Sequence, residues 1–196
     1  MNNNLANSIS ASIKVKEKIL GDIILMDQIL KLAERCLYAL QNGGKIIFCG
    51  NGGSFADAQH LSAELTSRFL FDRPALASIA LGTNSSSISA IANDYGYEDV
   101  FSRELEALGS VNDVMIAITT SGRSKNILKV LSIADEMKIT SYVFTGQTDV
   151  TFNDKNFECI KVPSQDTARI QECHILIGHF VCEFIESEMF DNDMEK

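Results

Sequence analysis

Apolar side chains recur at every third or fourth position over about residues 5–42, the spacing of one face of an α-helix. These positions include Ile19, Ile23, Leu30 and Leu37. The tripeptide NGG at 42–44 follows the pattern, and asparagine with glycine commonly ends a helix. The pattern therefore predicts one or two helices in this part of the chain.

Short apolar runs alternate with longer, more polar segments from residue 43 onward. The runs are KIIFCG (45–50), ALASIALG (75–82), DVMIAIT (113–119), TSYVFTG (140–146) and FECIKVP (157–163). Their Ile, Val, Phe and Ala content is typical of buried parallel strands. The segments predicted as helices lie at about 54–70, 84–108, 124–138 and 169–188. This alternation predicts an α/β fold with a five-stranded, doubly wound parallel sheet flanked by helices.

Length and composition favour one domain. The chain has 196 residues, of which 45% are hydrophobic, enough for one sizeable core. No repeat array or long linker divides it. We expect a single domain over 1–196, in which 1–42 forms an N-terminal helical segment and 43–196 an α/β sandwich.

Charge and cysteine content restrict the partners and the compartment. The formal net charge is -9, which argues against nonspecific binding of nucleic acid. The five cysteines lie in apolar stretches without a CxxC pair, so we expect buried reduced thiols. The first twenty residues lack a signal-peptide pattern, and the apolar run HILIGHFVCEFI is too short and too polar to span a membrane. We expect a cytoplasmic protein that binds neither nucleic acid nor membrane.

Two strand-to-helix loops carry the pattern of an anion site. GNGGS (50–54) follows the first predicted strand, and TTSGRS (119–124) follows the third. Both lead into a predicted helix N-terminus, where backbone amides and the helix dipole favour an anion such as a phosphate ester. Ser54 and Asp57 resemble a capping box. The same residues are also ordinary turn and cap residues, and neither loop matches a P-loop or a dinucleotide fingerprint.

The three histidines suggest chemistry beside the first loop. His60 and Glu64 stand four residues apart, so they lie on one face of a helix and could reach one substrate or one metal ion. The alternative is an ordinary exposed pair. His174 and His179 lie on the last predicted helix roughly 140° apart, so they cannot share a face. One of them is then a packed helix residue.

Four segments together resemble a known family. They are CGNGGSFADAQHLSAEL, ANDYGYEDVF, TTSGRSKN and RIQECHILIGHFVCEFIE, and they follow one another in order between residues 49 and 186. They resemble the sugar isomerase (SIS) superfamily and, within it, the phosphoheptose isomerases. The resemblance implies a flavodoxin-like fold, and a homotetramer assembled through the N-terminal helices with active sites at subunit interfaces. It also implies interconversion of sedoheptulose 7-phosphate and D-glycero-D-manno-heptose 7-phosphate, the first step of ADP- or GDP-heptose synthesis for lipopolysaccharide or capsule.

The resemblance also assigns roles to residues. It implies that Glu64 is the catalytic base and His179 the catalytic acid/base. It implies one zinc ion per subunit, bound by His60, Glu64, Gln171 and His179. The substrate-binding positions that it implies are Asn51, Gly52, Gly53, Ser54, Glu64, Arg68, Asn93, Asp94, Thr119, Thr120, Ser121, Ser124 and Gln171.

Ketose–aldose conversion through an enediol needs a base at carbon and a proton donor at oxygen. Glu64 and His179 supply both, so their presence favours an enzyme. Two alternatives remain open: a noncatalytic SIS protein that resembles the replication-initiator-associating factor, and a phosphosugar sensor or an isomerase of another sugar phosphate.

The implied zinc ligands raise a geometric problem. Gln171 and His179 are eight residues apart, which is ~12 Å along an unbroken helix, whereas zinc ligands lie within about 2.3 Å of the metal. Either the helix begins after Gln171, or one residue is not a ligand, or neighbouring chains combine. We favour the third explanation, in which Glu64 and His179 of one site come from different subunits.

Overall fold

The computed structural model describes residues 3–147 and 156–190. Five strands lie in these ranges: β1 (Ile46–Gly50), β2 (Ser78–Ala80), β3 (Val114–Ile118), β4 (Thr140–Thr145) and β5 (Phe157–Lys161). The helices are α1 (Asn4–Gly21), α2 (Ile23–Gln41), α3 (Gly53–Thr66), α4 (Ser85–Asp94), α5 (Val100–Leu108), α6 (Lys125–Glu136) and α7 (Thr167–Phe190). A 3-10 helix, η1 (Tyr97–Asp99), joins α4 to α5.

The strands form one parallel sheet in the order β2-β1-β3-β4-β5. The predicted α/β fold is therefore confirmed. The central strands β1 and β3 are buried along their whole length, which explains their unbroken apolar sequences. The order reverses direction between β1 and β3, and in such sheets ligands bind beyond the carboxyl ends of the strands at this point.

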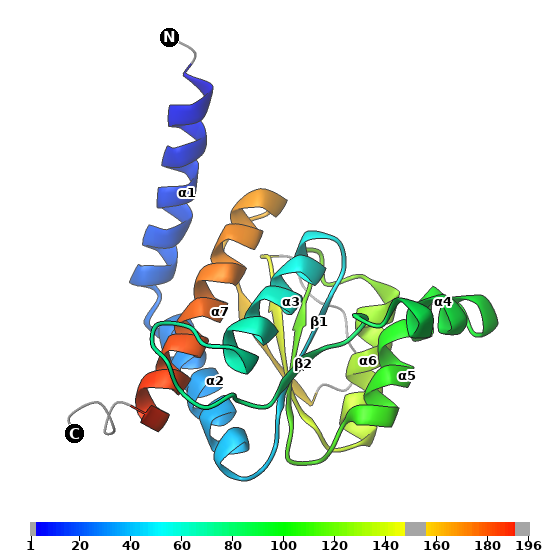
Figure 1. Cartoon of the computed structure of the whole chain (residues 1–196). Coiled ribbons are helices and arrows are strands. Elements are labelled where there is room, and N and C mark those ends of the chain that lie inside the picture. Colours follow the sequence, from blue (N-terminus) through cyan, green and yellow to red (C-terminus); the bar gives the residue numbers. More distant parts are fainter. Residues whose placement is uncertain (1–2, 148–155, 191–196) are drawn as a thin grey trace.

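Helices cover both faces of the sheet (Figure 1). Ile46 and Phe48 of β1 pack in a core with residues of α1, α2, α3 and α7. Ile47 and Cys49, which alternate with them, pack in a second core with residues of α5 and α6. The two-residue period of a strand thus places α3 and α7 together on one face.

The predicted helix over 84–108 is wrong as a single element. Helix α4 ends at Asp94, and Gly96 follows with φ 104, a backbone conformation that glycine adopts readily. The chain then turns through η1 into α5. The ANDYGYED sequence contained this break, because a positive φ at Gly96 cannot continue a right-handed helix.

Helix α1 projects beyond the rest of the domain (Figure 1). Polar contacts tie it to the first turns of α7: Arg169 donates to the Ser8 carbonyl at 2.7 Å, and Ser12 donates to Glu172 at 2.7 Å. Large apolar side chains of α1 and of the neighbouring helices remain exposed. They are Leu5, Ile9, Ile13, Leu20, Ile23, Ile24, Met26, Leu30, Leu176 and Phe180.

The burial of the cysteines and the polarity of the helices test the predictions of buried thiols and of no membrane span. Cys36, Cys49, Cys173 and Cys182 are buried thiols, as predicted, and burial raises the pKa of Cys49 to about 12. Cys159 is only partly buried. Among residues 3–147 and 156–190, none of the helices has the length and apolar character needed to cross a bilayer.

Candidate functional site

The glycine loop after β1 is shaped by close backbone contacts. A Cβ on Gly50 would lie 2.6 Å from the Ser54 carbonyl carbon, and Gly52 adopts φ 58, so both positions require glycine. The predicted capping box is wrong, because Gly52 is the N-cap of α3 and Ser54 lies buried inside the first turn. The loop therefore places the N-terminus of α3 at the point where the strand order reverses, and no side chain caps this helix end.

The hydroxyl-rich loop after β3 lies beside it. Thr119 is buried, and its hydroxyl accepts the Gly122 amide at 3.2 Å, so Thr119 shapes the loop. Ser121 is exposed, whereas Thr120 and Ser124 are half-buried. Ser124 is the N-cap of α6, and its side chain makes no capping hydrogen bond. Those three hydroxyls are therefore better placed than Thr119 to meet a ligand.

Paired side-chain amides join the two loops. Asn51 donates to Asn126 at 2.9 Å, and Asn126 donates back to Asn51 at 2.9 Å. The Tyr97 hydroxyl also donates to Asn51, at 3.2 Å. Sequence reasoning named Asn51 only as a substrate ligand and missed Asn126 and Tyr97. Asn126 stood inside the TTSGRSKN segment, but nothing local indicates that its partner lies 75 residues away.

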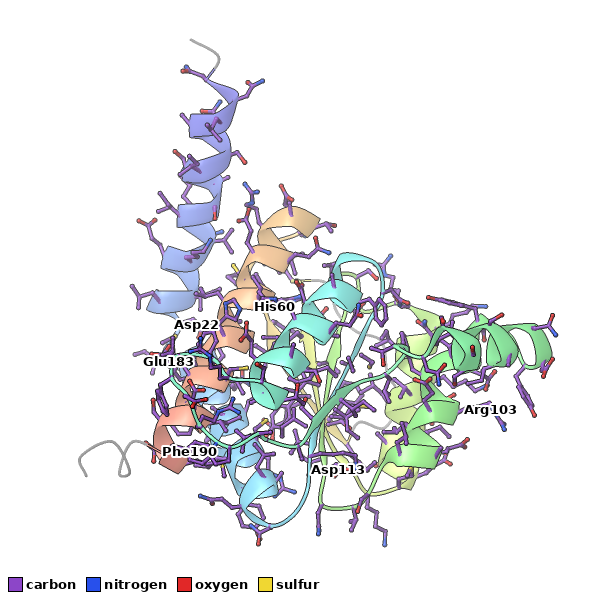
Figure 2. The ribbon with its side chains drawn as sticks, in the orientation of Figure 1. Asp22, His60, Arg103, Asp113, Glu183 and Phe190 are labelled. Carbon is purple, nitrogen blue, oxygen red and sulfur yellow. The ribbon has the colours of Figure 1, made fainter. Side chains whose placement is uncertain are left out.

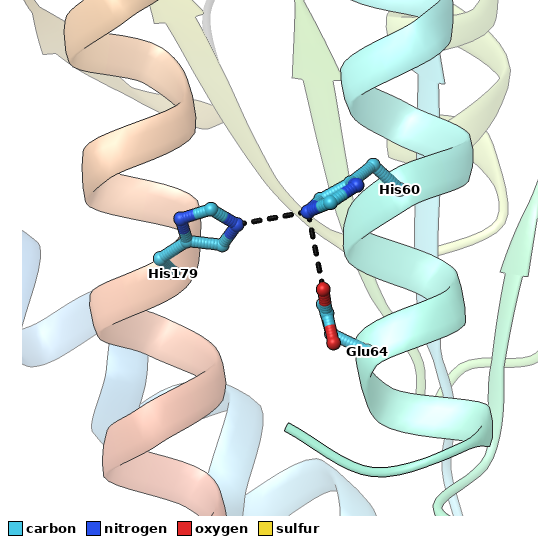
Figure 3. Close-up of side chains that lie close together, drawn as sticks. All are labelled: His60, Glu64 and His179. Carbon is cyan, nitrogen blue, oxygen red and sulfur yellow. Dashed lines mark hydrogen bonds and ion pairs between the residues drawn. The ribbon is translucent and has the colours of Figure 1, made fainter. Parts of the chain in front are cut away.

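A cluster of titratable side chains lies where α3 passes α7 (Figure 3). The His60 Nε2 lies 3.1 Å from Glu64 Oε1 and 2.9 Å from His179 Nε2. A single proton on His60 Nε2 can be donated to the carboxylate or to the second imidazole. The three groups therefore form one proton-sharing set at the surface of the chain, where His60 is 51% exposed.

The surroundings of His179 favour its neutral form. The Phe69 ring stacks on the His179 ring, with centroids 5.3 Å apart. Burial lowers the pKa of His179, as does the nearby His60, while Glu64 and Asp57 oppose the shift. Burial also raises the pKa of Asp57, a neighbour that sequence reasoning treated only as a helix cap. A neutral imidazole can accept a proton, which acid–base chemistry requires.

A glycine allows the two helices to approach so closely. A Cβ on Gly178 would lie 2.6 Å from Cδ2 of Leu61 and closer still to Cδ1. Leu61 and Gly178 directly adjoin His60 and His179 in sequence. The helix crossing thus sets the distance between the two imidazoles.

The prediction that Glu64 and His179 of one site come from different subunits is contradicted, because one chain brings them together. A late helix start is also wrong, since α7 begins at Thr167. Gln171 lies at the other end of α3, where its Nε2 would be 2.6 Å from a Cβ on Gly53. Within one chain, Gln171 is therefore a neighbour of the glycine loop and lies apart from the cluster.

The cluster has the donor set of a metal site. His60, Glu64 and His179 offer ligand atoms that all lie within 4.8 Å of one another. Two imidazole nitrogens and one carboxylate oxygen are the protein ligands of many catalytic zinc sites. The side chains present therefore fit a zinc ion.

The remaining predicted residues lie on other parts of the chain. Asn93 and Asp94 are exposed at the end of α4, with Asn93 donating to Asp94 at 2.7 Å. Figure 1 shows α4 at the side of the molecule opposite α7. Arg68 is exposed just beyond α3. His174 is buried against Phe144, so it is the packed helix histidine that the sequence predicted.

Comparisons with known proteins identify the family of the chain. The SIS domain family model matches residues 10–146. Phosphoheptose isomerase of Aneurinibacillus thermoaerophilus is 48% identical over 192 residues, which cover 98% of this chain and 97% of that protein. Phosphoheptose isomerase 2 of Campylobacter jejuni is 48% identical over 190 residues, covering 97% and 94% of the two chains.

Solved structures give the same result over nearly the whole fold. A phosphoheptose isomerase from Francisella tularensis superposes with a TM-score of 0.88 at 33% identity, covering 94% of this chain and 97% of that one. The enzyme from Neisseria gonorrhoeae gives 0.85 at 39% identity, covering 94% and 98%. These similarities show that the chain belongs to the phosphoheptose isomerase family of SIS domain proteins.

Proposed function

We propose that the protein interconverts D-sedoheptulose 7-phosphate and D-glycero-D-manno-heptose 7-phosphate. Family membership indicates an aldose–ketose isomerase. The observation that carries the assignment of roles is the cluster of His60, Glu64 and His179, in which a carboxylate and two imidazoles lie within 4.8 Å. Such a set can move protons at neighbouring carbon and oxygen atoms.

Glu64 is the base at carbon in this mechanism. Its carboxylate takes the proton from C1 of the ketose, which leaves an enediolate with its negative charge on the oxygen of C2. Neutral His179 then takes the proton from the oxygen of C1 and passes it to the oxygen of C2. Glu64 returns its proton to C2 as the carbonyl forms at C1. The sequence conserves atoms and charge and leaves both side chains in their starting forms.

The phosphate ester is the group that the two loops hold. The α3 and α6 N-termini supply backbone amides and the positive ends of helix dipoles. Hydroxyls of Thr120, Ser121 and Ser124 complete the contacts, while the Asn51–Asn126 pair keeps the loops together at 2.9 Å. Arg68, Gln171, Asn93 and Asp94 stay proposed substrate contacts.

Zinc is the proposed metal. His60, Glu64 and His179 would hold it, since their donor atoms fit. When bound, zinc would act as a Lewis acid that stabilises negative charge on substrate oxygen. An oxygen or nitrogen atom that holds the metal cannot take a proton at the same time, so the atoms of Glu64 and His179 that transfer protons would have to be free of zinc during that transfer.

Self-association completes the proposal. The apolar stripe on α1, α2 and α7 remains exposed in one chain, with Ile23 83% and Leu20 73% exposed. Exposed apolar patches of this kind mark protein–protein contacts. A homotetramer assembled through residues 1–42 would cover it, and light scattering would measure the mass. The buried thiols support a cytoplasmic location, where reduced cysteines persist.

Two alternatives are less favoured. A noncatalytic relative resembling the replication-initiator-associating factor would not need Glu64 in contact with His60 at 3.1 Å. A sensor, or an isomerase of another sugar phosphate, would need only the phosphate loops. We further propose that the heptose phosphate supplies ADP- or GDP-heptose synthesis for lipopolysaccharide or capsule.

An isomerase assay tests the proposal. Purified protein is given sedoheptulose 7-phosphate and a panel of shorter ketose phosphates, and aldose formation is followed by NMR. We expect turnover of the seven-carbon substrate, and a kcat lower by ~10²-fold or more in Glu64→Gln, since the amide cannot take a proton. A preference for another ketose phosphate would overturn the substrate, and a wild-type kcat in Glu64→Gln would remove Glu64 from the mechanism.

A further inference from the structure

A buried ion pair lies beyond the C-terminus of α3. Arg73 Nε donates to Glu186 Oε1 at 2.9 Å, and the two side chains are 1% and 0% exposed. Desolvation of both charges offsets much of their attraction, so a buried ion pair is weak evidence of a purely stabilising role. The other atoms of this pair show what it holds.

Arg73 binds the last carbonyls of α3. Its two terminal nitrogens donate to the carbonyl oxygens of Glu64 and Leu65, each at 2.7 Å, and one also donates to Ser67 at 3.1 Å. The last carbonyls of a helix lack partners within it, so a guanidinium there acts as a cap. One of the carbonyls that it fixes belongs to Glu64 itself.

Glu186 binds the segment that follows. Its carboxylate accepts the backbone amides of Phe69 at 2.9 Å and Leu70 at 2.6 Å. The Phe69 ring in turn stacks on His179. His179 and Glu186 are seven residues apart on α7, so they lie on the same face of the helix, about two turns apart. Glu186 therefore ties the ring that packs on His179 to the helix that carries His179.

Arg68 stands between these two attachments. The carbonyl of Ser67 before it is held by Arg73, and the amide of Phe69 after it is held by Glu186. An exposed side chain is thus presented from a backbone that is fixed on both sides.

We propose that Arg73 and Glu186 form a positioning pair, which sets Glu64, Arg68 and His179 relative to one another. The catalytic part of this inference rests on the proposed isomerase function. The geometric part stands by itself, because the pair contacts the backbone of Glu64 and the neighbour of His179.

The chain offers a matched control at the other end of the sheet. Asp113 is 1% exposed and, like Glu186, accepts two backbone amides, from Lys45 at 2.9 Å and Ser110 at 2.7 Å, and one cation, Lys45 Nζ at 2.6 Å. It precedes β3, whereas His60 lies on a helix that follows the carboxyl end of β1 (Figure 2). Asp113→Asn therefore removes a comparable buried charge away from the site.

The experiment compares Glu186→Gln with Asp113→Asn. Urea unfolding measures stability, and crystal structures measure the His60–Glu64 and His60–His179 distances. Zn²⁺ titration by calorimetry and isomerase kinetics follow. Both variants should lose stability, but only Glu186→Gln should widen the cluster, displace Phe69, and lower zinc affinity and kcat by ~10-fold to ~100-fold, as lost supporting contacts do at metal sites. Asp113→Asn should keep zinc affinity and kcat within about 2-fold of wild type, since Asp113 does not contact the residues that support the cluster.

Arg73→Lys serves as the second variant should Glu186→Gln fail to fold. It keeps the charge but not the fork that binds several carbonyls at once, so it should show the same changes in milder form. Wild-type cluster distances together with wild-type kcat and zinc affinity in a folded Glu186→Gln or Arg73→Lys protein would overturn the proposal. Should wild-type protein fail to isomerise sedoheptulose 7-phosphate, the proposed function fails, and the crystal structures still decide whether the pair positions the cluster.

Discussion

Replacing Gly178 by alanine should push α7 away from α3 at the point where the imidazoles meet. The added Cβ would lie 2.6 Å from Cδ2 of Leu61 and 3.0 Å from its Cγ, whereas ordinary contacts are 3.4–4 Å. Leu61 is fully buried in a densely packed core, so we expect its side chain to have little room to move. We therefore expect the helices to separate by about 1 Å, the shift that restores ordinary contact.

The magnitude follows from that shift. Overpacking a well-packed core costs about 1–3 kcal/mol of the free energy of unfolding. The same displacement acts on the neighbouring His60 and His179, whose Nε2 atoms lie 2.9 Å apart. Misplacement of catalytic groups by about 1 Å can lower kcat by ~10²-fold. We therefore expect a folded protein whose activity falls by far more than its stability would explain.

Urea unfolding, Zn²⁺ calorimetry and isomerase kinetics measure the three effects. Gly21→Ala is the matched control, because a Cβ there has no atom within 4 Å. It should leave kcat and zinc affinity unchanged. A Gly178→Ala protein with wild-type kcat and zinc affinity would refute the idea that this crossing sets the imidazole distance.

Three further changes test other parts of the molecule. Burial lowers the pKa of His174 to about 4, so as pH falls below about 6.5 only the unfolded chain binds a proton at this residue. Between pH 7 and 4.5, the free energy of unfolding should therefore fall by about 2 kcal/mol more in wild type than in His174→Gln. Urea unfolding that shows the same pH dependence in both proteins would contradict this. Ser124→Ala should raise KM about 10-fold or more with kcat nearly unchanged, because a hydrogen bond to a charged group contributes about 1.5–3 kcal/mol; an unchanged KM and unchanged inhibition by inorganic phosphate would place the phosphate elsewhere. Asn126→Ala leaves Asn51 without its paired amide, so it should lower the free energy of unfolding by about 1–3 kcal/mol and also raise KM. If thermal unfolding and KM are both unchanged, the two loops hold together without this pair.

The strands could be predicted because a buried strand has a continuous apolar sequence, which is a local feature. IIFCG and VMIAI are buried at every position and therefore read as continuous apolar runs. The i,i+4 placement of His60 and Glu64 is likewise local, since the helix alone fixes it. The two loops after β1 and β3 could be located for the same reason, because glycine and hydroxyl residues at strand ends indicate turns and helix N-termini.

The rest depends on how distant segments pack. His60 and His179 meet across 119 residues, and no helical spacing predicts that Gly178 permits the contact. The sequence left three explanations for the distance between Gln171 and His179 and favoured shared subunits. In the structure, one chain brings Glu64 and His179 together and holds Gln171 beside Gly53. Arg73 and Glu186 escaped notice because charged residues are ordinarily solvated, and only the fold shows both buried.

The pairing of α3 with α7 also decides when the site can form during folding. The contacts Phe69–Glu186, His60–His179 and Leu61–Cys182 span 117, 119 and 121 residues. Contacts so far apart in sequence close late, because the chain must first lose the entropy of a long loop. During synthesis, His60 and Glu64 leave the ribosome long before His179 exists. A nascent chain that lacks α7 therefore holds only two of the three side chains of the cluster, and α7 does not yet cover the apolar side of α3.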